Sequence, residues 1–391
     1  MAVPLKYSLR NLFVRKVSTA MTVLGVALVV VVFLLVMSLA EGVRKTFQTA
    51  VSPLNLVVMR VGAQSDVQSF VEKERYEVIR GLPGVGRDAQ GQPLVSPETV
   101  PLINVARKDG KKTNIIVRGV EPVAFLLRPP IPIVEGRLFR PGTNEAIVSR
   151  RTRERFAHMD VGDTIQAGSQ RWVVVGIFDA SGSPYDSEIW ADLNDVQAQT
   201  RRTGGFSIVR VRTSDRAARA RFIAAVKGDQ QVKLDAKPED EYYAEQMGTA
   251  RPIQFLAYFV GILMAVGASF GAMNTMYAQV SARTREIATL RALGFSRRSV
   301  LASFVIESIA LALLGGVVGG LVALVIVKFF LTAPTGTNNF NTFAEILFNF
   351  RLTPPLLLAG LVFSLGIGAF GGFFPAVRAA RLKIVNALRE A

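Results

Sequence analysis

Ser281–Gly320 reads SARTREIATLRALGFSRRSVLASFVIESIALALLGGVVGG and carries the chain from a basic turn into a long apolar segment. Its first eighteen residues hold five arginines and one glutamate. The apolar runs on both sides of the turn are longer than the roughly 20 residues that a helix needs to cross a bilayer. Because basic residues beside such runs mark the cytoplasmic side of a membrane, the stretch predicts a cytoplasmic turn between two membrane spans.

Ser281–Leu293, within this turn, is predicted to form a short helix. Gly294 ends it, because glycine is common just after a helix C-terminus. Phe295 and Ser296 are expected to begin the next helix.

One face of this short helix is mixed in polarity. At 100° per residue, Val280, Ile287 and Leu290 share a sector with Arg283 and Arg291. Such a face suits neither a protein core nor a fully solvated surface. Three alternatives stay open: the helix lies on the membrane surface with snorkelling arginines, it docks on another protein, or its charges only orient the chain.

The turn and the segment after it carry a longer motif. It reads R-x-R-E-I-A-T-L-R-A-L-G-F-S from Arg283, followed by the E-S pair Glu307 and Ser308 and by G-G-x-x-G-G at 315–320. The motif resembles permeases of the FtsX/MacB superfamily of ABC transporters, and the resemblance extends to both chain ends. In that family this turn is the coupling helix that rests on the ATPase subunit. The resemblance therefore implies ATPase coupling for seven residues: Arg283, Arg285, Glu286, Ile287, Leu290, Arg291 and Gly294.

Composition indicates a membrane part and a water-soluble part in one chain. Half of the 391 residues are hydrophobic, yet 19% are charged, which a purely membrane-embedded chain would not carry. The net charge is +16, and residues 1–17, 278–300 and 376–391 together hold +11 of it. Because this charge lies beside apolar spans, it favours a membrane protein over a nucleic-acid binder. The absence of cysteine excludes disulfides, thiolate catalysis and cysteine metal sites.

Four apolar segments are predicted to cross the membrane: 17–40, 253–277, 300–330 and 354–374. Their basic flanks place 1–16, 278–299 and 375–391 in the cytoplasm, 41–251 outside, and 331–353 as a short external loop. A signal peptide is the rival interpretation of the first segment, since Ser38-Leu39-Ala40 resembles a cleavage site. The segment exceeds the usual apolar region of such peptides, which favours retention as an anchor.

The outer segment, 41–251, is predicted to be an α+β domain with a net charge of +5. Near its two ends, a strand at 55–61 is followed by a helix that ends at Gly81, and strands at 206–213 and 231–235 flank a helix at 214–227. These two strand-helix-strand units are expected to form one lobe.

The middle of the outer segment, about 95–200, is expected to form an inserted, mainly β lobe. Its predicted strands are 114–120, 145–149, 163–167 and 170–178. The layout resembles the periplasmic core domain of MacB-type permeases, with V-G-D-T-I followed by W-V-V-V-G-I-F as a recognisable piece.

Two features inside the predicted spans call for separate interpretations. Glycines recur at four-residue spacing at Gly315, Gly316, Gly319 and Gly320, which predicts close helix packing or a dimer interface and no ligand. Glu307 is acidic and lies about 10 Å into its helix. A proton relay or ion site is one interpretation; its shallow depth, the nearby arginines and the resemblance favour a structural or coupling role.

No catalytic or cofactor motif accompanies these features. The single histidine, His158, has no motif around it, and the chain has no H-E-x-x-H, G-x-S-x-G or calcium loop. There is also no G-x-x-x-x-G-K-[ST] phosphate loop. We therefore expect a non-enzymatic chain without catalytic, cofactor or metal residues, and ATP and Mg²⁺ on a partner ATPase.

The resulting hypothesis is a permease subunit in the bacterial inner membrane, with a cytoplasmic ABC ATPase and a second copy of itself or a homologous permease as partners. The resemblance implies mechanotransmission of ATPase closure to the outer domain, for export, efflux, or lipoprotein or lipid extraction. A periplasmic membrane-fusion protein and an outer-membrane factor are possible further partners. The alternatives are an FtsX-like regulator of cell-wall hydrolases, disfavoured by the large outer segment, and a membrane enzyme or ion-coupled carrier.

Overall fold

The computed structural model describes residues 16–48, 51–167, 169–228, 233–246, 251–331, 335–339 and 341–382. Its contacts divide the chain into two units. The membrane unit comprises 1–41, 253–332 and 350–391, and the outer unit comprises 42–252 and 333–349.

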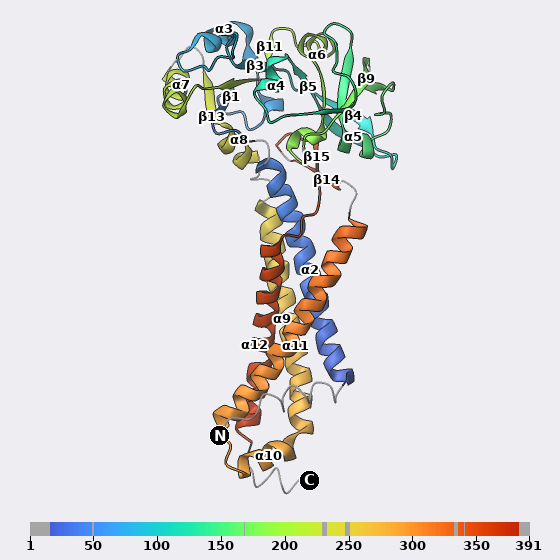
Figure 1. The fold of residues 1–391 in the computed structure, drawn as a ribbon, viewed down its shortest axis with the longest axis vertical. Coiled ribbons are helices and arrows are strands. Elements are labelled where there is room, and N and C mark those ends of the chain that lie inside the picture. The colour runs from blue at the N-terminus through green and yellow to red at the C-terminus, as the bar shows by residue number, and fades with distance from the viewer. Residues whose placement is uncertain are drawn as a thin grey trace. The chain divides into compact units, whose positions relative to one another are not determined.

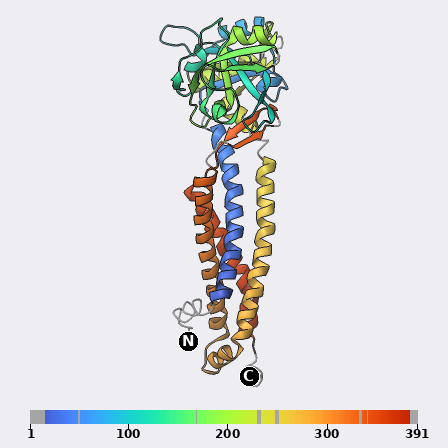
Figure 2. The ribbon, with the colours of Figure 1, turned by 90° about the vertical axis from the view of Figure 1, so that its right-hand side faces the viewer.

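Four helices long and apolar enough to cross a membrane run side by side (Figures 1 and 2), which confirms the predicted four-helix class. They are α2 (Lys16–Gln48), α9 (Arg251–Ala282), α11 (Arg297–Val325) and α12 (Pro354–Ala380). A π-helical turn, Ile326–Phe330, extends α11. The first helix runs eight residues past the predicted end of its span at residue 40, because Glu41, Arg44 and Lys45 end an apolar run without breaking a helix.

Glycines of α11 let it approach two neighbouring helices closely. A Cβ added at Gly315 would lie 2.8 Å from the Val26 Cβ of α2, and one at Gly316 would lie 2.3 Å from the Ser364 Oγ of α12. Gly319 likewise faces α2 and Gly320 faces α12. The four predicted packing glycines therefore pack helices within one chain.

The α+β lobe of the outer unit contains a four-stranded antiparallel sheet in the order β13-β1-β12-β3. Its strands are β1 (Asn55–Arg60), β3 (Val95–Glu98), β12 (Ile208–Arg212) and β13 (Leu234–Pro238), and its helices are α3 (Lys73–Gly81), α7 (Arg216–Gly228) and α8 (Glu239–Gln246). The predicted helix at 214–227 is capped by Asp215, whose Oδ1 accepts a bond from the Ala218 N–H at 2.7 Å. The strand predicted at 231–235 begins at Leu234, and residues 231 and 232 lie outside the described residues.

The predicted β lobe contains a seven-stranded mixed sheet in the order β4-β5-β10-β7-β9-β6, with β8 beside β9. Its strands are β4 (Leu102–Ala106), β5 (Lys112–Val120), β6 (Ile133–Gly136), β7 (Glu145–Ser149), β8 (Thr164–Ala167), β9 (Gln170–Phe178) and β10 (Glu188–Asp192). Short helices α4 (Val123–Leu126), α5 (Arg150–Arg155) and α6 (Leu193–Thr200) and the 3₁₀ turn η2 (Pro184–Ser187) connect them. Strands β7 and β9 have the predicted bounds. β7 is a short, mostly buried apolar run, whereas the first half of β9 alternates between exposed and buried side chains, and both patterns are typical of strands.

Two small sheets complete the outer unit. Strands β2 (Val71–Glu72) and β11 (Gly205–Phe206) pair near α3, and the 3₁₀ turn η1 spans Asp66–Gln68. The segment predicted as a short external loop forms a hairpin of β14 (Thr335–Asn338) and β15 (Glu345–Phe348). This hairpin belongs to the outer unit.

Candidate coupling site

The turn between α9 and α11 contains a separate helix, α10 (Thr284–Ala292). Helix α9 continues to Ala282, and Arg283 interrupts it with φ −113° and ψ 15°. The prediction of one helix from Ser281 was therefore wrong at its start, since its first residues complete α9. Gly294 has φ +92°, a left-handed conformation that favours glycine, and it ends the turn as predicted. The Ser296 Oγ then caps α11 by accepting a bond from the Ser299 N–H.

A buried ion pair joins this turn to α11. The Arg283 Nη1 donates to both carboxylate oxygens of Glu307, at 2.9 and 3.1 Å. Only 7% of the Arg283 side chain and 4% of the Glu307 side chain are exposed. The guanidinium also lies 6.0 Å from the centre of the Phe304 ring. Two charges that would be costly to bury alone are thus neutralised together.

The mixed face of the short helix is turned inward. Val280 and Ile287 are buried in a core with Met276, Phe304 and Ala376. Arg283 lies on this face because Glu307 neutralises it, while Leu290 and Arg291 are half-buried. The expectation that this face meets the membrane surface or a partner is corrected for Arg283 and Ile287, whose side chains are covered by their own chain.

The opposite face of α10 is exposed. Arg285, Glu286, Thr289 and Ala292 lie on it, and Leu293 follows with 67% of its surface exposed. The face therefore offers one positive charge, one negative charge and one large apolar side chain. Among the predicted coupling residues, Arg285, Glu286 and the glycine at 294 are exposed.

The E-S pair of the motif holds two different neighbours. Glu307 binds Arg283, whereas the Ser308 Oγ donates to the Gly368 carbonyl of α12 at 2.7 Å. A Cβ at Gly372 would lie 2.3 Å from the Ser308 Cβ, so only glycine leaves room for this contact. The adjacent residues Glu307 and Ser308 of α11 therefore hold the turn at Arg283 and helix α12, respectively. A carboxylate bonded to an arginine in this way favours a structural role over proton transfer.

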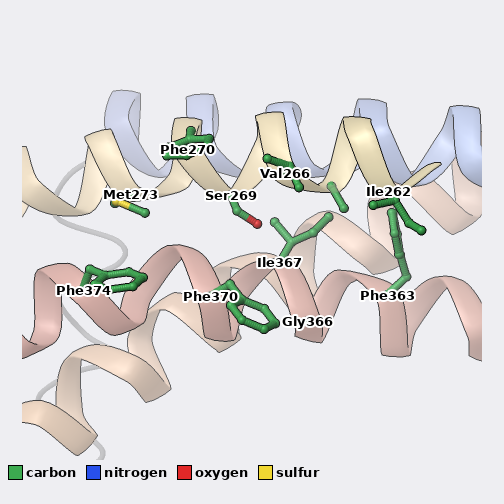
Figure 3. A pocket seen from close by; sticks show the side chains of 11 residues that line it. Ile262, Val266, Ser269, Phe270, Met273, Phe363, Gly366, Ile367, Phe370 and Phe374 are labelled. Atoms are coloured by element: carbon green, nitrogen blue, oxygen red, sulfur yellow. The ribbon is translucent and has the colours of Figure 1, made fainter. Parts of the chain in front are cut away.

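An apolar groove of about 430 Å³ lies between α9 and α12. Figure 3 shows Val266, Ser269 and Met273 of α9 facing Ile367 and Phe374 of α12. Ser269 is the one polar side chain among the lining residues, which include no charged group. The groove therefore matches the lipid interior in polarity and offers no acid–base chemistry.

The outer unit contains a buried ion network that the sequence did not reveal. Arg118 bonds to Glu188 at 2.6 Å, to Glu98 at 2.8 Å and to Asp66 at 2.9 Å. Arg128 donates to Glu98 at 2.6 Å. The network also contains Arg210, which lies 3.4 Å from Glu98 and donates to Glu239. Strands of both lobes contribute, so the network joins the two lobes.

The network shifts the pKa values of Glu98 and Arg118. Burial opposes the charge on Glu98, but Arg128, Arg210 and Arg118 outweigh it and hold the pKa of the carboxyl well below its usual range. Burial also disfavours the charge on Arg118, yet Glu188 and the other carboxylates raise its pKa well above the usual value. The sequence showed only scattered charges here, because their partners lie 20 to 112 residues apart.

A cleft of about 730 Å³ separates the two lobes on the side of α3 and α6. Tyr76, Phe206 and Leu193 form its buried apolar lining, and Glu121 projects from the β lobe. Burial raises the pKa of the Tyr76 hydroxyl to about 12 and raises that of the Glu121 carboxyl. The cleft has the size of a small-molecule pocket.

The described residues contain no candidate metal site, and His158 is part of no metal-binding group. Across those residues, no group of three or more His, Asp or Glu side chains could hold a metal ion. His158 is exposed at a turn, with φ 57°.

Two family models together match most of the chain. The MacB-like periplasmic core domain matches residues 19–228, and the FtsX-like permease C-terminal domain matches residues 258–384. The chain belongs to the FtsX/MacB family of ABC transporter permeases. It is accordingly a multi-pass membrane protein, and the outer unit is its periplasmic-type domain.

Individual relatives in this family are distant. The macrolide export ATP-binding/permease protein MacB of Hahella chejuensis is 23% identical over 397 residues, which cover 95% of this chain and 58% of that protein. The chain thus spans less than two thirds of this relative. The uncharacterised permease YknZ of Bacillus subtilis is 25% identical, with 98% of each chain covered. The solved periplasmic region of MacB from Actinobacillus actinomycetemcomitans has 11% identity and a TM-score of 0.37 over 51% of this chain and 94% of that one.

Proposed function

We propose that this FtsX/MacB-family permease couples ATP hydrolysis on a separate cytoplasmic ATPase subunit to movement of its outer domain. The buried Arg283–Glu307 pair carries the proposal, because it fixes α10 to the long helix α11. A force applied to the exposed face of α10 would then pass into α11 without first unfolding the turn. ATP and Mg²⁺ belong to the partner in this scheme, since the chain has no phosphate loop.

The exposed face of α10 is the proposed contact with the ATPase. Leu293 supplies an apolar anchor, and Arg285 and Glu286 supply charges that fix its orientation. Arg283 and Ile287 act as positioning residues, because their side chains lie inside the turn. The proposed transport process is export, efflux, or extraction of a lipid or lipoprotein. A second permease copy completes the proposed assembly.

Co-purification with the cognate ATPase and permease-stimulated hydrolysis test this proposal. Leu293→Asp, Glu286→Lys and the half-buried Arg291→Glu should each weaken binding by about tenfold or more, as loss of an interface anchor commonly does. Lys227→Glu, a charge reversal at an exposed site of the outer domain, is the matched control and should leave binding unchanged. The permease alone should hydrolyse no ATP. Unchanged binding and stimulation for all three α10 variants would refute the coupling role.

A further inference from the structure

The hairpin β14–β15 is built into the β lobe rather than resting on its surface. Leu347 is fully buried in the β-lobe core, together with Ile103 and Phe156. Ala344 is buried in a smaller cluster with Val100 and Ile116. Hydrophobic side chains in a shared core move with that core, because interiors are close-packed.

Polar contacts fasten the same hairpin at several points. The Leu347 N–H donates to the Ser187 Oγ at 2.7 Å, and the Arg155 Nε donates to the Glu345 Oε1 at 2.6 Å. The second carboxylate oxygen of Glu345 lies 4.0 Å from the Arg107 Nη1. Only 3% of the Glu345 side chain is exposed. A carboxylate held between two arginines of the lobe therefore anchors β15.

The opposite strand of the hairpin is shaped around this carboxylate. Gly336 of β14 lies beside Glu345, and a Cβ there would come within 1.8 Å of the Glu345 Oε1. Any larger residue would push the carboxylate away from Arg155. The glycine thus keeps the anchor in place.

The chain connects the membrane helices to different lobes of the outer unit. Helix α8 directly precedes α9 in sequence and packs on β1 and β13 of the α+β lobe, where Lys237 bonds to Glu245 at 2.7 Å. The hairpin joins α11 to α12, and its buried side chains and Glu345 are anchored in the β lobe. Its Asn341 carbonyl also accepts bonds from Ser65 at 2.9 Å and Gln68 at 3.1 Å, which follow β1. The two connections meet where the Asn339 Nδ2 donates to the Gln246 Oε1 at 3.3 Å.

We infer that the hairpin is a second transmission element, through which α11 and α12 act on the β lobe, and that Glu345 is the positioning residue that holds it. The inference rests on the proposed function, because the movement it transmits would originate at α10. Its geometry is independent of α10, however, since every contact named above lies within the outer unit.

The absence of native cysteine permits a direct test with two spin labels, at Ser169→Cys in the β lobe and Thr353→Cys at the start of α12. In the full chain in lipid nanodiscs, without ATPase, the distance distribution should be narrow. Glu345→Gln should widen it about twofold, because the ion pair with Arg155 is replaced by a weaker bond from the guanidinium to a neutral amide oxygen. Gly336→Ala should widen it similarly, whereas Glu345→Asp, which keeps the charge, should restore most of the narrow distribution.

Glu145→Gln is the matched control. It removes a two-bond ion pair with Arg137 in the same lobe without touching the hairpin, so the distribution should stay narrow. An unchanged width for Glu345→Gln, or equal widening for the control, would overturn the inference.

A second arm separates this inference from the proposed function. With the cognate ATPase and ATP, Glu345→Gln should keep permease-stimulated hydrolysis and lose the ATP-driven displacement of the Ser169 label. If the unmodified permease fails to stimulate hydrolysis, the proposed function fails, while the first arm still decides the role of the hairpin. If the variant keeps the full displacement, the hairpin transmits nothing and the inference is refuted.

Discussion

Replacing Glu307 by glutamine should release α10 from α11. The substitution removes the negative charge and leaves the Arg283 guanidinium buried beside a neutral amide. Breaking a buried ion pair on one side typically costs about 3–5 kcal/mol. Glutamine keeps one acceptor oxygen, so we expect the lower end, about 3 kcal/mol, which corresponds to roughly a 100-fold rise in the detached population of the turn.

Amide hydrogen exchange of residues 284–292 in the purified permease measures this population. Exchange of these amides should accelerate by about 100-fold in Glu307→Gln, because each must open with the turn. The double variant Arg283→Met/Glu307→Leu buries no charge, and an apolar pair of similar volume is often neutral. Its protection should therefore return to within about tenfold of the unmodified protein.

Glu286→Gln is the control for this experiment, since it neutralises an exposed carboxylate on the same helix. Exposed ion pairs contribute at most about 1 kcal/mol, so its exchange should change by less than about fivefold. The reasoning is refuted if Glu307→Gln exchanges like the unmodified protein, or if the double variant is as poorly protected as the single one.

Three further predictions concern the packing of α11 and α12, the ion network at Glu98, and the membrane topology. Gly372→Ala should destabilise the α11–α12 contact by about 1–3 kcal/mol through overpacking. Gly366→Ala should be neutral or stabilising, because a Cβ at Gly366 would have no atom within 4 Å. Thermal unfolding of the two variants measures this difference. Glu98→Gln should lower the unfolding temperature at pH 7. The folded-state pKa of Glu98 is depressed, so the stability that its carboxylate contributes is fully present above about pH 4.5 and is lost as the pH falls below that value. The difference in unfolding temperature between the unmodified protein and Glu98→Gln should therefore shrink in acid. Equal differences at pH 7 and pH 3.5 would contradict this prediction. In intact cells, an impermeant thiol reagent should label Ser169→Cys but not Ser299→Cys, and labelling of both would disprove the four-span topology.

The membrane helices were predictable from sequence because their signal is local. Long apolar runs with basic flanks identify spans, and small residues four apart identify packing faces. The glycines at 315 and 316 follow this rule, with neighbours on α2 and α12. Gly267 and Gly271 have the same spacing, yet a Cβ there meets no described atom within 4 Å. Four-residue spacing alone therefore does not show whether a glycine packs against another helix of the chain, or against which one.

The environment of the turn that contains α10 was only partly predictable from the sequence. The helical spacing of 100° per residue correctly grouped Ile287 with Arg283 on one face. The arginine on this apolar face, however, argued against a position in the protein core. Only the fold brings Glu307, 24 residues away, to that arginine and makes the face an inner one. The same limitation hid the Arg118 network and the anchoring of Glu345, because a buried charge and a solvated charge look alike until the partner is placed.

Photocrosslinking from residue 293 is the most direct test of the central claim that α10 carries the contact with the ATPase. A benzophenone amino acid would replace Leu293, and a second permease variant would carry it at Met21, which is 66% exposed on the span of α2. With the cognate ATPase bound, the residue-293 probe should give a permease–ATPase product and the Met21 probe should give none. Failure of the residue-293 probe to crosslink the bound ATPase, or equal crosslinking from both positions, would contradict the account.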